Sequence, residues 1–519
     1  MDADSAFGKW LLWAVAVGTM GMTWLWAGML TSWLKPFVWL FLVIFVALVM
    51  GGFAAARPGS TGSILQPERF ARSRWWFFLD PFFYSGALFL AFLVLQWSNS
   101  GRTLVFDRPS LKWIYLPPPH PGWPSAINKA EAAQMLQWFF SPWVAALVLR
   151  SPWVSRRGVM QFLRFFAYQA GLLALFGLVQ FVSGTHSIYW LRPLQCDFFA
   201  SFGYANHAAA YFVMMGLLAA GFLYREIFRR DPATKRSRIV FLACSLLLCL
   251  MGANFSLSRA GVILAWTMAC FVATYGLLRG WRSLSPAGKF NLALATLATV
   301  SMFYFAVAGF GGRAIHREFR AQATIHHVLL PILDEVDLGL GEERLMLWQA
   351  AWRMWHEEPW LGLGGWGYRY RVVACVPQEK LGSLTGNAGM ANVHCDLLQF
   401  LVEFGAIGSG LLLAGVGCLF WSLIRTERKT GAVWVMVSIG LCLVVVHSLI
   451  DLPFRCPAII LTWVLLLAAL PRVTGGVTNQ RESASAVRGR VRASGTAVTV
   501  TRHVRRGEDA IALPNYAKQ

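Results

Sequence analysis

Long apolar segments are the feature that most constrains the fold of this chain. A helix needs about 20 consecutive apolar residues to cross a bilayer, and the sequence offers about twelve such segments. They cover about residues 10–30, 36–55, 76–97, 132–149, 160–182, 207–224, 239–256, 260–279, 290–309, 397–424, 431–449 and 457–470. Only 14% of the residues are charged and 57% are hydrophobic, which is unlike a soluble globular protein. We therefore expect an all-α polytopic membrane protein with about 12 transmembrane helices.

The positions of arginine and lysine predict how these helices are oriented. The net charge is +21, and the densest basic clusters follow every second apolar segment. Cytoplasmic loops carry an excess of these residues, so we expect both termini in the cytoplasm. The segments 98–130, 183–206, 256–259, 310–395 and 451–456 then share the extracytoplasmic face. The proline-rich segment 98–130 predicts an irregular loop with room for one surface helix.

The apolar segments divide the chain into four parts. Residues 1–309 hold the first nine spans, 310–395 form a large, partly helical extracytoplasmic (periplasmic) loop, 396–471 hold the last three spans, and 472–519 form a basic cytoplasmic tail. The first apolar segment lacks a small-residue cleavage site, which predicts a retained span rather than a signal peptide. The tail has no apolar period, which indicates disorder. We expect it to lie near anionic membrane lipids and not to bind nucleic acid, because it has few aromatic residues to stack on bases.

Cysteines and carboxylates give no sign of a metal site. The nine cysteines show no ligand spacing such as Cys-x-x-Cys, and most lie inside apolar segments. There cysteine packs as a small hydrophobic residue. No carboxylate cluster suggests a metal ion either, so we expect neither a metal nor another cofactor.

Two arginines stand at positions where a charge needs an explanation. Arg259 lies in the shortest outer turn, between two apolar segments, where burying an arginine costs a few kcal/mol. It is either an interfacial side chain whose charge extends to water or an anion-binding group that faces a cavity. Arg344 opens a stretch whose apolar residues recur at helical spacing from Leu345 to Trp355. Taken alone, Arg344 is also compatible with an ordinary exposed charge.

The glycine-rich run from Gly362 to Gly367 follows no parallel strand and opens no βαβ unit, so it does not predict nucleotide binding. It predicts a tight turn after a helix that stops near Pro359. Glycines such as Gly364 and Gly365 either let backbone amides approach a ligand or simply make the turn.

His394 stands just before the tenth apolar segment. An isolated histidine is more often structural than catalytic, but imidazole titrates near neutral pH and can accept a proton from a hydroxyl. Asp396 and Glu403 are close enough in sequence to orient it. Further polar residues stand at the outer ends of the sixth and eleventh segments: Asn206, His207, His447 and Asp451. Polar groups gathered at one edge of the membrane predict a site.

These residues occur in ordered motifs that resemble the O-antigen ligase and O-antigen polymerase (Wzy-C type) family. In chain order the motifs are Gly203-Tyr-Ala-Asn206-His207-x-Ala209, Ser258-Arg259-Ala-Gly261, Arg344-x-x-x-Trp348, Pro359-Trp-Leu-Gly-Leu-Gly364, His394-x-x-Leu-Leu-Gln399 with Glu403-x-Gly405-x-x-Gly408, and His447-Ser-Leu-Ile-Asp451-Leu-Pro. Each motif is weak alone, but their order and their shared outer face make the set specific. The resemblance covers about residues 202–457.

The resemblance implies a metal-independent membrane glycosyltransferase of the bacterial inner (plasma) membrane, with a role in cell-surface polysaccharide or lipopolysaccharide biosynthesis. Its donor would be an undecaprenyl-diphosphate-linked glycan used on the periplasmic side, and its acceptor a glycan or lipid. By the same resemblance Arg259 and Arg344 would bind the donor diphosphate, and His394 would act as general base on the acceptor hydroxyl or orient it. The resemblance leaves a ligase, a polysaccharide polymerase and a protein O-glycosyltransferase open, and the segment from His447 to Asp451 favours the polymerase slightly.

One position departs from the family pattern. The residue after the histidine is often Asn or another small polar residue, and here it is Cys395. A disulfide from Cys395 to Cys375, Cys196 or Cys456 is open on an oxidising face.

A transporter of a small solute or anion is the alternative from a different class. Transporters tend to have internal repeats and helices broken near the membrane midplane, and the sequence predicts neither. For an enzyme we expect Arg259, Arg344 and His394 at one outward cavity beneath residues 310–395. A transporter would place them at the midplane, and a scaffold protein would leave them scattered in solvent.

Overall fold

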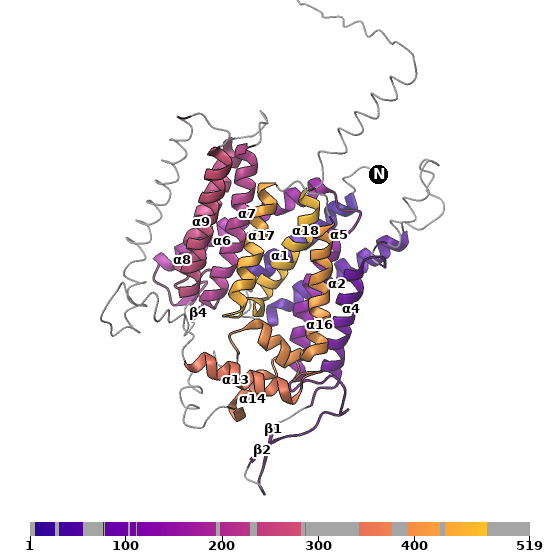
Figure 1. The fold of residues 1–519 in the computed structure, drawn as a ribbon. Coiled ribbons are helices and arrows are strands. Elements are labelled where there is room, and N and C mark those ends of the chain that lie inside the picture. The colour runs from indigo at the N-terminus through magenta and orange to yellow at the C-terminus, as the bar shows by residue number, and fades with distance from the viewer. Residues whose placement is uncertain are drawn as a thin grey trace, which may run out of the picture. The chain divides into compact units, whose positions relative to one another are not determined.

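The computed structural model describes residues 6–25, 31–54, 76, 78–101, 104–109, 112–193, 198–228, 236–281, 286, 342–375, 392–425 and 431–474 (Figure 1). The predicted ninth span at 290–309 lies outside these residues. So do much of the predicted outer loop, at 310–341 and 376–391, and the predicted tail from residue 475 onward.

Helices dominate the described part of the chain. They are α1 (Ala6–Trp24), α2 (Thr31–Ala54), α4 (Pro81–Ser98), α5 (Lys129–Arg150), α6 (Arg156–Val182), α7 (Ala205–Phe228), α8 (Arg236–Phe255), α9 (Arg259–Trp281), α13 (Glu342–Glu357), α14 (Tyr368–Cys375), α16 (Asp396–Ile424), α17 (Ala432–Ser448), the 3₁₀ turn η3 (Pro453–Arg455) and α18 (Pro457–Thr474). Among the described residues, 7 helices are long and apolar enough to cross a membrane: α4, α5, α6, α7, α8, α9 and α16. Shorter apolar helices lie within α2, α17 and α18. The chain is therefore an all-α multi-pass membrane protein, and the total of twelve spans stays a prediction.

The segment between α4 and α5 differs from the irregular loop that its prolines predict. It contains an antiparallel hairpin of β1 (Leu104–Asp107) and β2 (Lys112–Tyr115), in which Leu104 pairs with Tyr115. Both strands are rich in β-branched and aromatic residues, which favour extended backbone. The expectation of an irregular loop with a surface helix is thus wrong for these residues. A second, very short pair joins β3 (Ser187–Ile188) and β4 (Arg192–Pro193).

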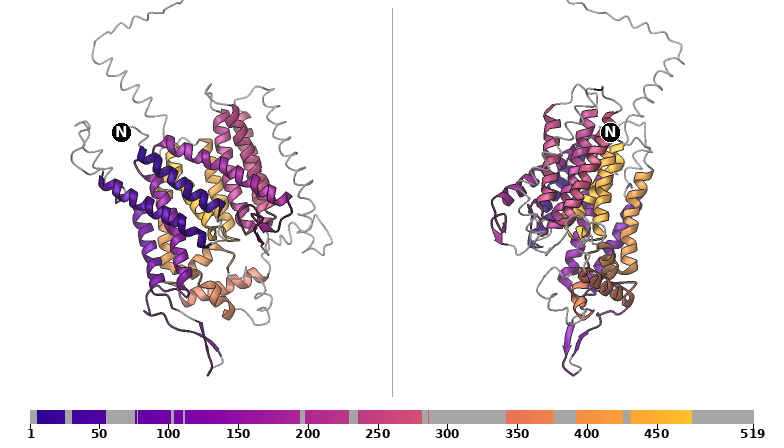
Figure 2. Two further views of the ribbon diagram at one scale, coloured as in Figure 1. Left: turned by 180° about the vertical axis from the view of Figure 1, so that it is seen from behind. Right: turned by 60° about the vertical axis from the view of Figure 1, so that its left-hand side comes forward.

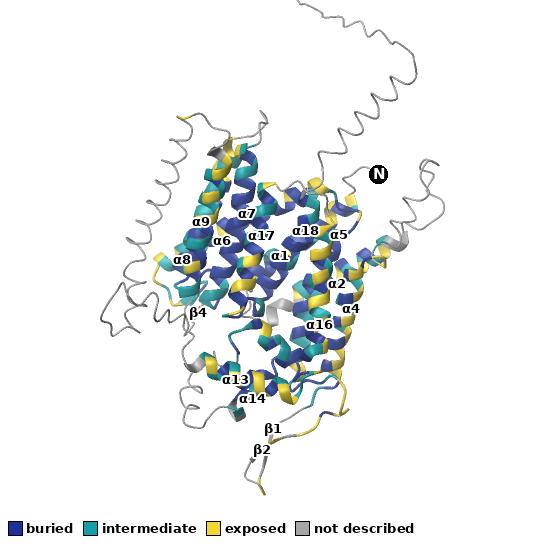
Figure 3. Cartoon of the chain, in the orientation of Figure 1, coloured by how far each residue is buried: buried dark blue, intermediate teal, exposed yellow. Residues whose placement is uncertain are grey.

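The helix α7 lies at the centre of the packing and contacts α6, α8, α9 and α17 (Figures 1 and 3). Small residues line it, and Ala208, Ala209 and Ala210 are completely buried. A Cβ atom added at Gly221 would come within 2.8 Å of the Cα atom of Val433 in α17. Small side chains let membrane helices approach this closely, which explains the burial of α7. On another side, α1 and α2 pack against each other and against α5 (Figure 2).

Arginine side chains join the ends of four helices where the sequence predicts the cytoplasmic face. Asp80 caps α4, and Arg150 at the end of α5 contacts both of its carboxylate oxygens at 2.6 and 2.8 Å. Arg150 also donates to Ser422 Oγ in α16 at 2.9 Å. Arg472 of α18 donates to the carbonyl of Arg150 at 2.8 Å. These bonds fix the ends of α4, α5, α16 and α18 relative to one another.

The helix α16 is broken at Gly405, where the backbone has φ 62° and ψ −172°. The turn that follows α13 occupies the break through main-chain hydrogen bonds: Leu363 N to Val402 O, 2.9 Å; Gly364 N to Glu403 O, 2.8 Å; Ala406 N to Pro359 O, 2.7 Å; Ile407 N to Trp360 O, 3.1 Å. Backbone groups freed inside a membrane need such partners. The expectation of unbroken helices is therefore wrong for α16, because glycine at residue 405 allows a conformation that an apolar pattern does not reveal.

Candidate active site

Asp451 is the centre of a polar cluster between α17 and η3, and its side chain is almost completely buried. Its carboxylate accepts hydrogen bonds from Tyr204 Oη at 3.1 Å, from the amide of Asn206, and from the backbone N–H of Leu452 at 2.9 Å. His394 Nδ1 lies 3.4 Å from Asp451 Oδ1. Residues far apart in the sequence thus meet at one carboxylate.

The groups around this carboxylate keep it ionised. Burial raises the pKa of Asp451, but the hydrogen bond from His394 and the basic side chains of His447, His394 and Arg344 lower it more strongly. The resulting pKa is about 2. The pKa of the Tyr204 hydroxyl is raised in turn, by burial and by the Asp451 charge, so this hydroxyl stays protonated and donates to Asp451.

His394 occupies a strained backbone position just before α16. Its φ is 54°, in the left-handed region that a non-glycine residue rarely adopts. The N–H of Val393 donates to the side-chain oxygen of Gln399 at 3.1 Å, and the N–H of Asp396 donates to the carbonyl of Asp451 at 3.3 Å. These contacts hold both sides of His394. Strain of this kind is found where a side chain must be aimed, and here the ring is aimed at Asp451.

The two predicted anion-binding arginines border the same cluster. Arg344, in the first turn of α13, donates to the carbonyl of Ile450, the residue before Asp451. Arg259 is the first residue of α9 and is half-buried. The hydroxyl of its neighbour Ser258 donates to the Asn206 side-chain oxygen. Both arginines and His394 therefore stand at helix ends. Arg344 contacts the residue before Asp451, and Arg259 follows Ser258, which bonds to the Asn206 side chain.

Two further predicted residues pack around the Asp451 turn. His207 Nε2 lies 2.9 Å from the carbonyl oxygen of Leu452, and its ring packs edge-on against Tyr204 at 4.9 Å. His447 Nε2 lies 3.8 Å from Asp451 Oδ2 and is buried. Both histidines contact the Asp451 turn directly.

Three other predicted site residues make their contacts away from Asp451: Gly364, Gly365 and Glu403. A Cβ atom at Gly364 would lie 2.4 Å from the Cα atom of Ala126, and one at Gly365 would lie 2.3 Å from the side chain of Met135. The two glycines thus allow the turn to approach α5 and the chain before it. Glu403 forms an ion pair with Arg455 at 2.7 Å, and both side chains are buried.

Sequence reasoning missed Tyr204, Ser258 and Arg455. Tyr204 and Ser258 each stand within two residues of a predicted site residue, in the same motif. A polar residue that interrupts the start of an apolar span is a signal that would have identified them. Arg455 ends the short turn that begins at Asp451, and its charge between two apolar segments carries the same signal.

Three cysteines that the sequence leaves open to disulfide bonding are described by the structure. Cys375, Cys395 and Cys456 are free thiols, so Cys395 forms a disulfide with neither Cys375 nor Cys456. Cys196 lies outside the described residues. Within the described residues, no group of three or more His, Cys, Asp or Glu side chains is arranged to hold a metal ion.

Comparison with known proteins agrees with the motifs from Ser258 to Gly408. The sequence model of the O-antigen ligase family matches residues 244–413. The match runs from α8 into α16, so it includes Arg259, Arg344 and His394 but ends before Asp451. No curated protein matches the chain. Residues 244–413 of this multi-pass membrane protein therefore belong to the O-antigen ligase family.

Proposed function

We propose that this protein is a membrane glycosyltransferase of polysaccharide biosynthesis, which transfers or polymerises glycan from an undecaprenyl-diphosphate donor. The reaction takes place on the periplasmic face of a bacterial inner membrane. The observation that carries the proposal is the pairing of His394 with the ionised Asp451 beside Arg344, in a chain matched by the O-antigen ligase family.

In this proposal His394 is the general base. Its Nδ1 faces Asp451, so Nε2 is on the other edge of the ring, where an acceptor hydroxyl can lie. As the hydroxyl oxygen attacks the anomeric carbon, Nε2 takes the hydroxyl proton and the bond from that carbon to the diphosphate oxygen breaks. The Asp451 carboxylate stabilises the imidazolium that forms. A single displacement of this kind inverts the anomeric centre.

Arg344 and Arg259 act on the leaving group. The diphosphate gains negative charge as its bond to the sugar breaks, and planar guanidinium groups bind phosphate oxygens with two parallel hydrogen bonds. Charge stabilisation that grows toward the transition state lowers the barrier. The Asp451 turn is held beneath this site by Asn206, His207 and His447. The acceptor whose hydroxyl attacks is a glycan or a lipid.

The placement of these residues supports an enzyme over a transporter. Many transporters also have broken membrane helices, as α16 is broken at Gly405. However, the turn after α13 occupies that break, and Arg259, Arg344 and His394 stand at helix ends instead of mid-helix.

The test uses purified protein with undecaprenyl-diphosphate-linked glycan extracted from the native cells. We expect His394→Ala and Arg344→Ala to stop glycan transfer in protein that still folds and reaches the membrane. Arg259→Ala should reduce the rate of transfer. Arg353→Ala and His356→Ala are matched controls, because both side chains are exposed on α13. Wild-type turnover in the three site variants would contradict the site. Wild-type protein that transports the glycan but never transfers it would favour the transporter.

A further inference from the structure

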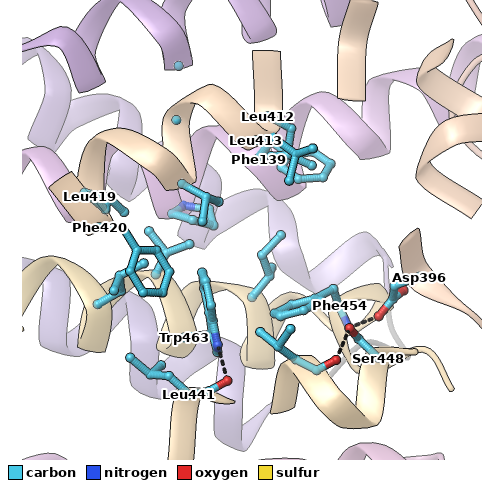
Figure 4. Close-up of a pocket in the computed structure, with 18 of the residues that line it drawn as sticks. Phe139, Asp396, Leu412, Leu413, Leu419, Phe420, Leu441, Ser448, Phe454 and Trp463 are labelled. Atoms are coloured by element: carbon cyan, nitrogen blue, oxygen red, sulfur yellow. Dashed lines mark hydrogen bonds between the residues drawn. The ribbon is translucent and has the colours of Figure 1, made fainter. Parts of the chain in front are cut away.

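An apolar cavity of about 550 Å³ lies between α4, α5, α16, α17 and α18 (Figure 4). Its described lining residues include no arginine or lysine. Two polar groups on its wall are bonded within the protein. Trp463 Nε1 donates to the carbonyl of Leu441 at 3.1 Å, and Asp396 Oδ2 accepts from the N–H of Phe454 at 2.8 Å (Figure 4). An apolar wall of this kind does not by itself identify a ligand.

A second cavity, of about 310 Å³, lies in a groove between α1 and α6, which we call the α1–α6 groove. The two helices contact each other and begin at the same end of the molecule (Figure 2). The rings of Phe7 and Trp153, near the two helix starts, are 5.5 Å apart, and those of Trp13 and Phe165, further along, are 6.1 Å apart. The basic clusters of the sequence predict that this end faces the cytoplasm. The groove therefore leads from the predicted inner surface of the membrane towards its core.

The lining of the groove changes from polar to apolar along both helices. Lys9, Ser155 and Gln161 line it near the helix starts, and Ala16 and Phe165 line it further along. The rise from Lys9 to Ala16 is roughly 10 Å along α1. The headgroup region of a bilayer gives way to acyl chains over a similar depth. This gradient matches a phospholipid, whose polar head lies at the surface and whose chains extend inwards.

The charge of the groove favours an anionic lipid. Lys9 carries the only charge among the described lining residues, and its side chain is exposed. Arg156, at the start of α6, is engaged elsewhere, because its guanidinium donates to the carbonyls of Arg472 at 3.0 Å and Val473 at 2.9 Å. A basic side chain at the inner membrane surface attracts the anionic lipids of the cytoplasmic leaflet.

We propose that the α1–α6 groove binds one anionic phospholipid of the inner leaflet, with its phosphate at Lys9 and an acyl chain along Trp13 and Phe165. Selectivity comes from the charge of the headgroup, and the acyl chain adds packing contacts. A lipid in this position contacts α1 and α6 at once, so it stabilises the packing of the first helix against the bundle. The groove is separate from the Asp451 cluster, and its test requires no glycan transfer.

The first measurement is the melting temperature of delipidated protein in neutral detergent, titrated with dioleoyl phosphatidylglycerol. For wild-type protein we expect a saturable rise, because a ligand that binds only the folded state stabilises it. Phosphatidylethanolamine with the same chains, or inorganic phosphate alone, should each give a much smaller rise. An equal rise with phosphatidylethanolamine would show that the headgroup charge does not matter. An equal rise with phosphate would show a site for free anions, and either result overturns the proposal.

Two variants test the groove itself. Lys9→Gln removes its charge, and Gln161→Trp obstructs it from an exposed position. Arg236→Gln is the matched control, because it removes one exposed charge at the same predicted face, from the start of α8. We expect Lys9→Gln to raise the phosphatidylglycerol concentration for half of the effect about fivefold. Gln161→Trp should reduce the rise in melting temperature, and Arg236→Gln should leave both quantities near wild type. Equal effects of Lys9→Gln and Arg236→Gln would contradict a specific site.

Photolabelling locates the bound lipid. Phosphatidylglycerol with a diazirine in one acyl chain should label peptides that contain Trp13 or Phe165, and unlabelled phosphatidylglycerol should compete. Lys9→Gln should weaken this labelling, and Arg236→Gln should not. Labelling that is spread over the other helices without preference for α1 and α6 would show that the groove holds no particular lipid.

Discussion

Asp451 connects the residues of the candidate site because three separate segments of the chain contact its carboxylate or the residue before it. Tyr204 and Asn206 bind it from the start of α7, His394 from the start of α16, and Arg344 reaches the preceding carbonyl from α13. The carboxylate therefore has two roles, which are to fix these segments together and to orient the His394 ring. Each role gives a prediction.

Asp451→Asn should leave the side chain nearly the same size but remove its charge. The His394 ring then loses the anion that orients it and stabilises its protonated form. We expect kcat for glycan transfer to fall by about 10²–10⁴, the usual contribution of positioned acid–base catalysis. The measurement is single-turnover transfer with saturating donor. A kcat within a factor of two of wild type would show that Asp451 does not assist His394.

Asp451 should also make the stability of the protein depend on pH in acid. Its pKa is about 2 in the folded protein and 3.8 ordinarily, so the ionised form stabilises the fold. This contribution, about 2 kcal/mol, is complete above the ordinary pKa and is lost as the pH falls through the folded pKa. We expect the melting temperature of wild type to fall between pH 4 and pH 2 more steeply than that of Asp451→Asn. Parallel curves for the two proteins would contradict the low pKa.

At the scale of single elements, the break in α16 depends on one residue. Gly405 has a backbone conformation that only glycine adopts readily, and a Cβ atom there would lie 2.3 Å from the carbonyl oxygen of Trp360. We expect Gly405→Ala to destabilise the protein by about 2 kcal/mol or more, measured as a lower melting temperature in detergent. Gly410→Ala on the same helix is the control, because nothing lies within 4 Å of its added Cβ atom. Equal melting temperatures for the two variants would show that the break is not held by residue 405.

An ion pair joins two further elements, α16 and η3. Arg455 binds Glu403 and stacks between Trp366 and Phe400, with ring centroids 5.0 and 5.2 Å away. Gln399 also donates to Glu403, and Gln399 holds the chain next to His394. This network connects the turn that carries Asp451 to the segment that carries His394.

A double-mutant cycle tests this network. Removing one partner of a buried ion pair leaves an unpaired charge and typically costs about 3–5 kcal/mol. We expect Glu403→Gln and Arg455→Met each to lower the melting temperature strongly, and the double variant to be more stable than the sum of both effects predicts. Strictly additive effects would show that the two side chains do not stabilise the fold as a pair.

At the scale of the whole molecule, the predicted topology places the two ends of the helices on opposite sides of the membrane. Arg108 is exposed in the hairpin turn between β1 and β2, and Arg157 is exposed at the start of α6. With a membrane-impermeant maleimide on spheroplasts, we expect Arg108→Cys to be labelled above the wild-type background. Arg157→Cys should be labelled only after permeabilisation. Labelling of both variants in intact spheroplasts would contradict the orientation that the basic clusters predict.

Much of the helical architecture follows from the sequence, because an apolar run of span length has one stable solution in a bilayer. The predicted spans at 239–256 and 260–279 correspond to α8 (Arg236–Phe255) and α9 (Arg259–Trp281) within a few residues. The span predicted at 76–97 begins later, at Pro81, because the Asp80 side chain caps the helix there. Apolar content places a span, but capping contacts set its ends.

The sequence by itself determined the class of protein and the approximate positions of the described spans, because hydropathy is a local property of the chain. Only the tertiary structure decided that Asp451 is the centre of the site and that Glu403 pairs with Arg455. It also decided that a turn would occupy the break in α16. These features depend on contacts between segments that lie from about 40 to about 250 residues apart, and no local pattern in the chain encodes such contacts.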